Sequence, residues 1–292
     1  MILVTGFTGN TGSLVVEKLL TKYSPNQIVG ITRNTKYKNS FEINVEFTEL
    51  ENEIEIETIF QKYNFDSIIH IANIRYSPFL IKLANKFNIP KIILVHTTGV
   101  YSKYRAYSEL YEKIEEEILH NSYINTNYII LRPTMIFGNE RDHNMHKLIK
   151  FLSKYPVFPV FGDGSALLQP VHVEDLSDGI VSALENSNLV NENYVLSGGT
   201  VIKYKQVLQL IKNELNKKIL FIHIPIKLAI FMAQIYETVI KKPLISVEQV
   251  KRIQEDKSYS NQKAKEDLNF EPRSFKNGII NEIKLLREKG LI

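Results

Sequence analysis

Short apolar runs alternate with amphipathic segments along the first half of the chain. The apolar runs predict buried strands at residues 2–5, 27–32, 45–50, 65–73 and 91–95. The amphipathic segments predict helices at residues 13–20, 51–63 and 76–87. Strands that alternate with helices over short connections form βαβ units, which predict a parallel sheet covered by helices on both faces. Ligands of such a sheet bind at the carboxyl ends of its strands.

The first predicted strand runs into a turn with glycines at Gly6, Gly9 and Gly12, and a helix follows. The first glycine permits the tight turn, the second lets the backbone approach a pyrophosphate, and the third lets helix and strand pack closely. Phosphate then binds at the N-terminus of the helix. This context predicts a dinucleotide site, and a glycine turn without a ligand is the alternative. The turn residues expected to contact the cofactor are Gly6, Thr8, Gly9, Asn10, Thr11 and Gly12.

The end of the second strand favours NADP(H) over NAD(H). An acidic residue at this place binds the ribose 2′-hydroxyl of NAD, whereas a nearby arginine accommodates the 2′-phosphate of NADP. The chain has Thr32 and Arg33 here, with Lys36 and Lys38 close behind. The alternative is that Arg33 is only a solvated loop residue.

The composition of the chain excludes several kinds of partner and site. The 292 residues suit one doubly wound domain with a smaller lobe. The formal net charge of +4 comes from interspersed lysines and acids, so we expect no nucleic-acid partner. The absence of cysteine excludes disulfides and zinc–thiolate sites. The chain opens directly into a strand, and the apolar segment 220–240 is too interrupted to span a bilayer, so we expect a cytoplasmic protein without a membrane partner.

Several motifs resemble the extended short-chain dehydrogenases/reductases of the sugar-nucleotide epimerase/dehydratase branch. They are the turn 5–12 and the segments 65–73, 131–138, 161–164 and 171–176, which include Leu-Arg-Pro, Phe-Gly-Asp-Gly and Val-His-Val-Glu-Asp-Leu. The resemblance implies an α/β Rossmann-type doubly wound sheet with a small C-terminal mixed substrate lobe. It places 1–138 and about 170–198 in the nucleotide domain, and 139–169 and 199–292 in the lobe.

The resemblance also implies further cofactor contacts. Glu49 and Leu50 stand where the family carries an Asp-Leu pair beside the adenine. His70 ends the fourth strand, where we expect a structural role rather than a catalytic one. Two more sets are expected at the cofactor: Ile71, Ala72 and Asn73 after that strand, and Pro133 beside the nicotinamide.

The catalytic stretch departs from the family. Thr97 stands at the family's catalytic Ser/Thr, but no tyrosine has a lysine four residues later. The downstream Lys-Ile-Glu-Glu-Glu-Ile run aligns Lys113 with the family lysine, which leaves Glu109 at the tyrosine position. Three interpretations stay open. Glu109 or a displaced Tyr101, Tyr104 or Tyr107 supplies the proton; the site only binds; or the tyrosines belong to the core. The last interpretation rests on an apolar stripe of Tyr107, Leu110, Tyr111, Ile114 and Ile118.

The second half supplies the expected substrate contacts, which are Asn139, Arg141, Asn144 and Gln169. His143 and His146 fit no metal-ligand spacing, so we expect no metal. Asp175 is expected to cap a helix or anchor the fold.

Two functions compete. The first is an NAD(P)-dependent epimerase, dehydratase or reductase that acts on a nucleotide sugar by hydride transfer. The second is a catalytically silent NADP(H)-binding regulatory or assembly protein, which the missing Tyr-x-x-x-Lys pair favours. A homodimer is a family expectation.

Overall fold

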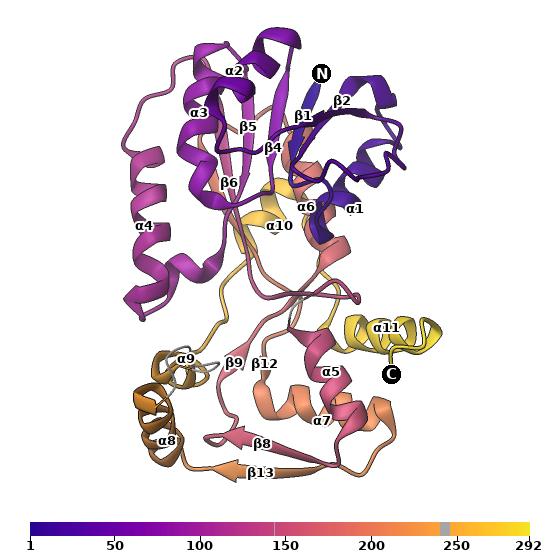
Figure 1. Ribbon diagram of the computed structural model, residues 1–292, viewed down its shortest axis with the longest axis vertical. Helices are drawn as coiled ribbons and strands as arrows, with labels where there is room; N and C mark the ends of the chain where they lie inside the picture. The colour runs from indigo at the N-terminus through magenta and orange to yellow at the C-terminus, as the bar shows by residue number, and fades with distance from the viewer. Residues whose placement is uncertain (143, 240–245) are drawn as a thin grey trace.

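The chain folds into a larger sheet-containing domain and a smaller lobe, stacked along the long axis of the molecule (Figure 1). The structure is a computed structural model that describes residues 1–142, 144–239 and 246–292, without the side chains of residues 105–107 and of Val239. His143 and the side chain of Tyr107, both considered above, therefore lie outside the described residues.

A seven-stranded, wholly parallel sheet forms the larger domain, in the order β11-β6-β5-β4-β1-β2-β3. Its strands are β1 (Ile2–Thr5), β2 (Ile28–Thr32), β3 (Asn44–Phe47), β4 (Ser67–His70), β5 (Lys91–Val95), β6 (Asn127–Pro133) and β11 (Glu192–Leu196). The chain passes to β2 and β3 on one side of β1 and returns to β4 on its other side. This switch in strand order opens a crevice at the carboxyl ends of β1 and β4, where α/β folds bind their ligands.

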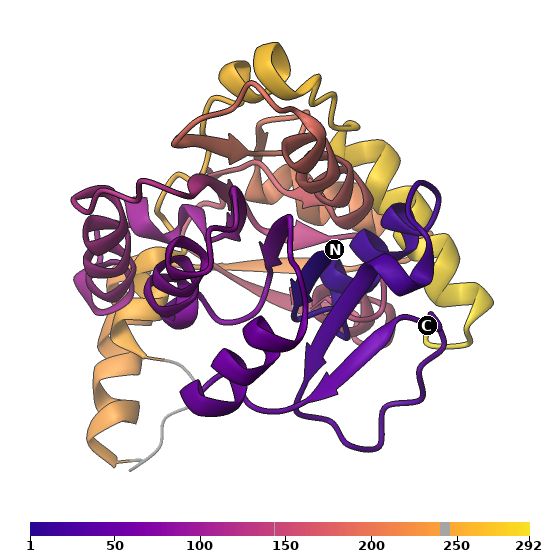
Figure 2. The same cartoon turned by 90° about the horizontal axis from the view of Figure 1, so that it is seen from above.

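Helices cover both faces of this sheet, as the view from above shows (Figure 2). One face carries α1 (Asn10–Leu19), α6 (Val173–Glu185) and α10 (Gln262–Leu268). The other face carries α2 (Glu53–Lys62), α3 (Ser77–Lys86) and α4 (Arg105–Leu119). Short 3₁₀ turns are η1 (Pro25–Gln27), η2 (Ile74–Tyr76) and η3 (Thr98–Tyr101). Ile2 and Val4 of β1 face the first group of helices and Leu3 faces the second, because neighbouring side chains of a strand point to opposite faces.

The smaller lobe has a separate core built mainly from helices. Its helices are α5 (Met145–Lys154), α7 (Tyr204–Leu215), α8 (Ile226–Val239), α9 (Val247–Arg252) and α11 (Phe275–Glu288). Three two-stranded sheets complete the structure: β8 (Val157–Phe161) with β13 (Leu220–Ile224), β9 (Leu167–Leu168) with β12 (Ile202–Lys203), and β7 (Ile136–Phe137) with β10 (Val171–His172).

The Rossmann-type fold expected from the sequence is confirmed, with local corrections. Helix α6 begins at Val173, so Asp175 lies inside its first turn, and the side chain of His172 caps the helix instead. The Asp175 carboxylate accepts hydrogen bonds from the backbone N–H and Nε of Arg273, at 2.9 and 2.8 Å, and so anchors the fold. Helix α10, which the sequence boundaries place in the lobe, packs on the sheet through Ala264 and Leu268.

A buried polar network joins α4 to the sheet. Arg132 of β6 donates from Nε to both carboxylate oxygens of Glu115, each at 3.0 Å, and from a terminal nitrogen at 2.6 Å. Another terminal nitrogen of Arg132 donates to Asn193 Oδ1 at 2.7 Å. His96 Nδ1 lies 3.0 Å from Glu115 and its Nε2 lies 3.0 Å from Ser77 Oγ. These contacts fix the rotation of α4 about its own axis.

The rotation of α4 revises the predicted apolar stripe. Ile114 and Ile118 are buried as predicted, and Tyr111 is half-buried. The inclusion of Leu110 is wrong, because that side chain is exposed. The charged Glu115 faces inward instead, because Arg132 and His96 form hydrogen bonds with its carboxylate.

We expect Glu115→Gln to lower the free energy of unfolding by about 3 kcal/mol, because it leaves the buried Arg132 charge uncompensated. Burial opposes the ionisation of Glu115, but hydrogen bonds from His96 and Arg132 outweigh it and hold the pKa of this carboxyl below its usual value. Urea unfolding followed by circular dichroism measures the change. Glu109→Gln on the exposed side of the same helix is the matched control and should unfold like the wild type. Equal stability of all three proteins would contradict this account of α4.

Candidate functional site

At its glycine positions, the turn after β1 leaves no room for a side chain. Gly6 has a φ of +73°, and a Cβ added there would lie 2.8 Å from the backbone nitrogen of Ala72. A Cβ at Gly12 would lie 2.2 Å from the carbonyl oxygen of Gly6. Gly9 is the N-cap of α1. The N-terminus of α1 is therefore available to a phosphate group, and the turn fits the pyrophosphate of a dinucleotide.

A cavity of about 340 Å³ opens beside this turn, at the carboxyl ends of β1, β2 and β4. It is lined by six residues that the sequence assigned to the cofactor, namely Gly6, Thr8, Arg33, Leu50, Ala72 and Asn73. The other seven assigned residues do not line it: Gly9, Asn10, Thr11 and Gly12 form the start of α1, Glu49 is exposed, Ile71 packs against the core of the sheet, and Pro133 lies in β6. Pro133 ends β6, where its carbonyl accepts a hydrogen bond from Thr98 Oγ1 at 3.2 Å.

Charged residues that the sequence reasoning missed also line this cavity. Arg75 and Tyr76 enter it from η2, and Glu51 enters from the segment after β3. The hydrogen bond from Tyr76, together with the positive charges of Arg33 and Arg75, holds the pKa of Glu51 below its usual value. The signal for Arg75 was its place in the sequence two residues after the segment 71–73, which the sequence assigned to the cofactor.

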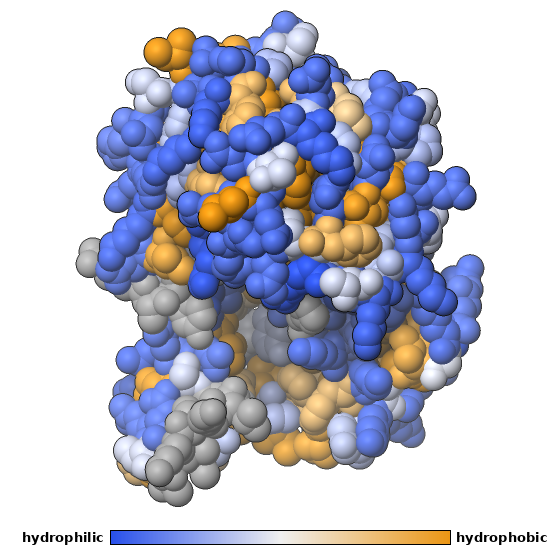
Figure 3. All heavy atoms as spheres, turned by 45° about the horizontal axis from the view of Figure 1, so that its top comes forward, coloured by the Kyte–Doolittle hydropathy of each residue, from blue (hydrophilic) through white to orange (hydrophobic). Residues whose placement is uncertain are grey.

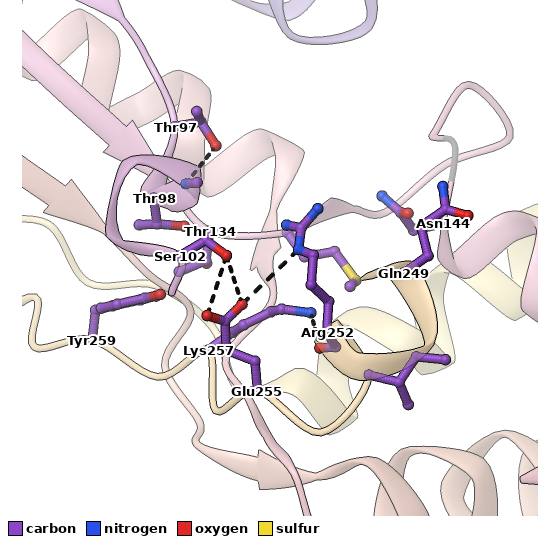
Figure 4. A pocket seen from close by; sticks show the side chains of 13 residues that line it. Thr97, Thr98, Ser102, Thr134, Asn144, Gln249, Arg252, Glu255, Lys257 and Tyr259 are labelled. Atoms are coloured by element: carbon purple, nitrogen blue, oxygen red, sulfur yellow. Dashed lines mark hydrogen bonds and ion pairs between the residues drawn. The ribbon is translucent and has the colours of Figure 1, made fainter. Parts of the chain in front are cut away.

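The second cavity, of about 330 Å³, lies between η3 and the smaller lobe (Figure 4). Thr97 and Asn144 both line it, and they are residues to which the sequence assigned a catalytic and a substrate role respectively. Its other charged or aromatic lining residues, which the sequence reasoning missed, are Arg252, Glu255, Lys257 and Tyr259. Figure 3 shows the molecular surface hollowed between the two parts of the molecule.

A buried carboxylate organises the second cavity. Glu255 accepts hydrogen bonds from Ser102 Oγ at 3.0 and 3.2 Å and from the backbone N–H of Lys103 at 2.7 Å (Figure 4). The guanidinium of Arg252 lies 4.0 Å from the same carboxylate. Lys257 Nζ donates to the carbonyl of Arg252 at 3.1 Å, and burial lowers the pKa of this ammonium group. The cavity thus holds two cationic side chains, of which Arg252 lies beside the Glu255 carboxylate.

The remaining predicted substrate residues connect parts of the site. Asn139 Nδ2 donates to Asn10 Oδ1 at 2.7 Å, and the guanidinium of Arg141 donates to the carbonyl of Thr8 at 2.5 Å. The segment after β7 is therefore fastened to the glycine turn. Gln169 is buried, where it donates to the carbonyl of Gly198 and accepts from the backbone N–H of Tyr259. It therefore positions Tyr259 without lining either cavity.

The predicted catalytic residues separate into two groups. Thr97 Oγ1 accepts a hydrogen bond from the backbone N–H of Gly99 at 3.0 Å. A Cβ added at Gly99 would lie 3.3 Å from Thr97 Oγ1 and 3.2 Å from the ring of Tyr111, so that ring borders the turn. Glu109 and Lys113 instead pair with each other at 2.7 Å, with side chains 54% and 69% exposed. Neither of these two lines a described cavity.

Tyr101 does not line the second cavity, but it packs against Tyr259, which does. Its ring centroid is 5.3 Å from that of Tyr259 and 5.6 Å from the guanidinium carbon of Arg132. His70 has the structural surroundings expected of it: its Nδ1 lies 2.6 Å from Thr5 Oγ1 and its Nε2 lies 3.1 Å from the carbonyl of Asn73. Complete burial lowers the pKa of His70 to about 3, so the ring is neutral at physiological pH.

The family model of the NAD dependent epimerase/dehydratase family matches residues 2–115 and 106–197. The chain belongs to this family. UDP-glucuronic acid 4-epimerase from Bacillus cereus, solved with UDP-glucuronic acid and NAD, is similar at a TM-score of 0.76 and 19% identity, over 99% of both chains. UDP-glucose 4-epimerase from Thermotoga maritima, solved with UDP-glucose, is similar at a TM-score of 0.74 and 19% identity, over 99% of both chains. At these identities the two structures support the fold alone.

A curated relative is NADH dehydrogenase [ubiquinone] 1 alpha subcomplex subunit 9 of Arabidopsis thaliana. It is 24% identical over 157 residues, which are 50% of this chain and 39% of the relative. The chain thus matches well under half of that protein's length.

Among the described residues, no helix is both long and apolar enough to cross a bilayer. The same part of the chain contains no group of three or more His, Asp or Glu side chains arranged to hold a metal ion.

Proposed function

We propose that the protein binds NADP(H) and a nucleotide sugar in adjoining cavities and transfers hydride between them. One observation carries the proposal. The dinucleotide cradle at Gly6 and the cation-lined cavity at Thr97 both open at the carboxyl edge of a single parallel sheet. This edge is where α/β folds of this order bring a cofactor and a substrate together.

The charges around the ribose end of the first cavity support NADP(H) over NAD(H). Thr32 and Arg33 stand at the end of β2 in place of the acidic residue that binds an unphosphorylated ribose. Arg75 brings a second guanidinium into the same cavity. Arginine is suited to bidentate recognition of phosphate, and two of them outnumber the single Glu51 carboxylate there.

The second cavity supports a nucleotide sugar as the substrate class. Arg252 and Lys257 supply positive charge for phosphate groups, whereas Ser102, Thr134 and Asn144 supply hydrogen-bonding groups for sugar hydroxyls. The similar epimerases from Bacillus cereus and Thermotoga maritima bind UDP-glucuronic acid and UDP-glucose.

The bound nicotinamide supplies the hydride chemistry, and the protein supplies orientation and proton transfer. Thr97 holds the reacting oxygen of the substrate by a hydrogen bond. The sequence assigned the proton to Glu109 or a displaced tyrosine and a supporting charge to Lys113, but Glu109 and Lys113 lie on the exposed side of α4. We assign the proton to Tyr111, because its ring borders the turn that carries Thr97.

The alternative is a catalytically silent NADP(H)-binding protein. The observation that favours it is the position of Lys113, because the charge that lowers the phenol pKa in the family lies away from Thr97. The similarity to a protein named as a subunit of NADH dehydrogenase [ubiquinone] is compatible with this alternative.

We expect Arg33→Ala and Arg75→Ala each to weaken NADPH binding by about tenfold, because each removes a charge-assisted contact to the 2′-phosphate. NADH affinity should stay within about twofold, since NADH lacks that phosphate. Fluorescence titration of the reduced nicotinamide measures both constants. Lys38→Ala is the matched control, since Lys38 carries the same charge but does not line the cavity. Equal losses for NADPH and NADH would refute the assignment of these arginines.

We expect Thr97→Val to reduce turnover by about 100-fold and to leave cofactor affinity unchanged, because Thr97 lines the second cavity and not the dinucleotide cavity. The assay follows the conversion of UDP-glucose or UDP-glucuronic acid by liquid chromatography in the presence of NADP⁺, because an epimerase or dehydratase returns the hydride to its substrate and leaves no net change in nicotinamide absorbance. Thr58→Val, on the exposed side of α2, is the isosteric control and should match the wild type. Full activity of Thr97→Val would remove Thr97 from the reaction. NADPH binding by the wild type without any turnover would favour the silent alternative.

A further inference from the structure

Exposed apolar side chains are concentrated in one short segment of the smaller lobe. Large hydrophobic residues that are 47–62% exposed fall within residues 220–235, and they are Leu220, Ile222, Leu228, Phe231, Met232 and Ile235. Four of them, at 228, 231, 232 and 235, have the i, i+3, i+4, i+7 spacing of one helical face. The opposite side of α8 carries Ala229 and Ala233, which are buried with Val250 of α9. Helix α8 is thus apolar on two sides, of which only one has a partner in the described structure.

The neighbouring two-stranded sheet also exposes apolar side chains. Val157 of β8 pairs with Leu220 of β13, and both side chains are exposed. The next residues, Phe158 and Phe221, turn inward and pack against the lobe's core. We call the exposed set the distal apolar face, and its members are Val157, Leu220, Ile222, Leu228, Phe231, Met232 and Ile235. Strands β8 and β13 lie at the end of the lobe farthest from the seven-stranded sheet, with α8 beside them (Figure 1).

The segment that contains most of the distal apolar face also carries a positive net charge. Residues 217–251 contain six lysines and two glutamates, a net charge of +4, which equals that of the whole chain. Lys217, Lys218 and Lys227 are exposed on the described part of this segment. The remainder of the protein therefore has no net charge, so the segment that exposes apolar side chains accounts for the net positive charge of the chain.

We propose that the distal apolar face binds the surface of an anionic lipid bilayer. Apolar side chains that enter the boundary between headgroups and acyl chains, beside lysines that face anionic headgroups, are the physical requirements of peripheral membrane binding. The concentration of cations selects this occupant, because it complements a negatively charged surface. Helix α8 has 14 residues, too few to span the hydrocarbon core, so it lies in the plane of the interface. The sequence-based expectation of no membrane partner rested on the absence of a spanning segment and did not consider this surface.

Co-sedimentation of the full-length protein with lipid vesicles tests the proposal. We compare vesicles of phosphatidylcholine alone with vesicles of phosphatidylcholine and phosphatidylglycerol, at low and at high salt. The wild type should sediment with the anionic vesicles, and salt should weaken the binding. The double variant Phe231→Gln/Met232→Gln should lose about tenfold or more in the partition coefficient. The control variant Ile54→Gln/Ile124→Gln changes two exposed apolar residues of the larger domain and should bind like the wild type.

Two further measurements keep the result interpretable. Thermal unfolding establishes that both double variants fold, and analytical ultracentrifugation without vesicles gives their oligomeric state. No binding of the wild type to anionic vesicles, or equal binding by the Phe231/Met232 variant, overturns the proposal. A dimer that the same variant dissociates also overturns it, because a second copy of the chain would then cover this face.

Discussion

The site depends on the contact between the Glu115 carboxylate and the Arg132 guanidinium. A buried carboxylate is stable only when its charge is paired and its oxygens accept hydrogen bonds, and Arg132 and His96 meet both conditions. Because this contact fixes α4 against β6, it also decides which residues of the helix face the sheet. Tyr111, one turn before Glu115, consequently borders the turn that carries Thr97, whereas Glu109 and Lys113 are exposed.

Much of the larger domain could be predicted from the sequence, because its signals are local. The strand β5 has the predicted bounds, and the glycines at 6, 9 and 12 impose a turn whose geometry depends on neighbouring residues alone. The rotation of α4 about its own axis could not be predicted in this way. Glu109 and Lys113 have the four-residue spacing of the family's catalytic pair, and the same spacing forms an ordinary exposed ion pair. Only the tertiary contact of Glu115 distinguishes the two interpretations.

The smaller lobe was less predictable for a related reason. Arg252, Glu255 and Lys257 are separated from Thr97 by about half of the chain, and no local pattern connects them. Gln169 was expected to contact substrate. In the structure its side chain is buried, lines neither cavity and accepts a hydrogen bond from the backbone N–H of Tyr259. The glycine turn of the cavity proposed for the cofactor is therefore formed by local sequence, whereas the cavity proposed for the substrate is assembled by packing between the two parts of the molecule.

The most direct test of this account compares turnover by Tyr111→Phe and Lys113→Ala, with NADP⁺ and the nucleotide sugar that the wild type accepts. The account predicts that Tyr111→Phe lowers kcat by about tenfold or more, the usual contribution of a positioned acid or base, while Lys113→Ala stays at the wild-type rate. Loss of activity in Lys113→Ala with full activity in Tyr111→Phe would contradict it, because the exposed side of α4 would then carry the catalytic residue.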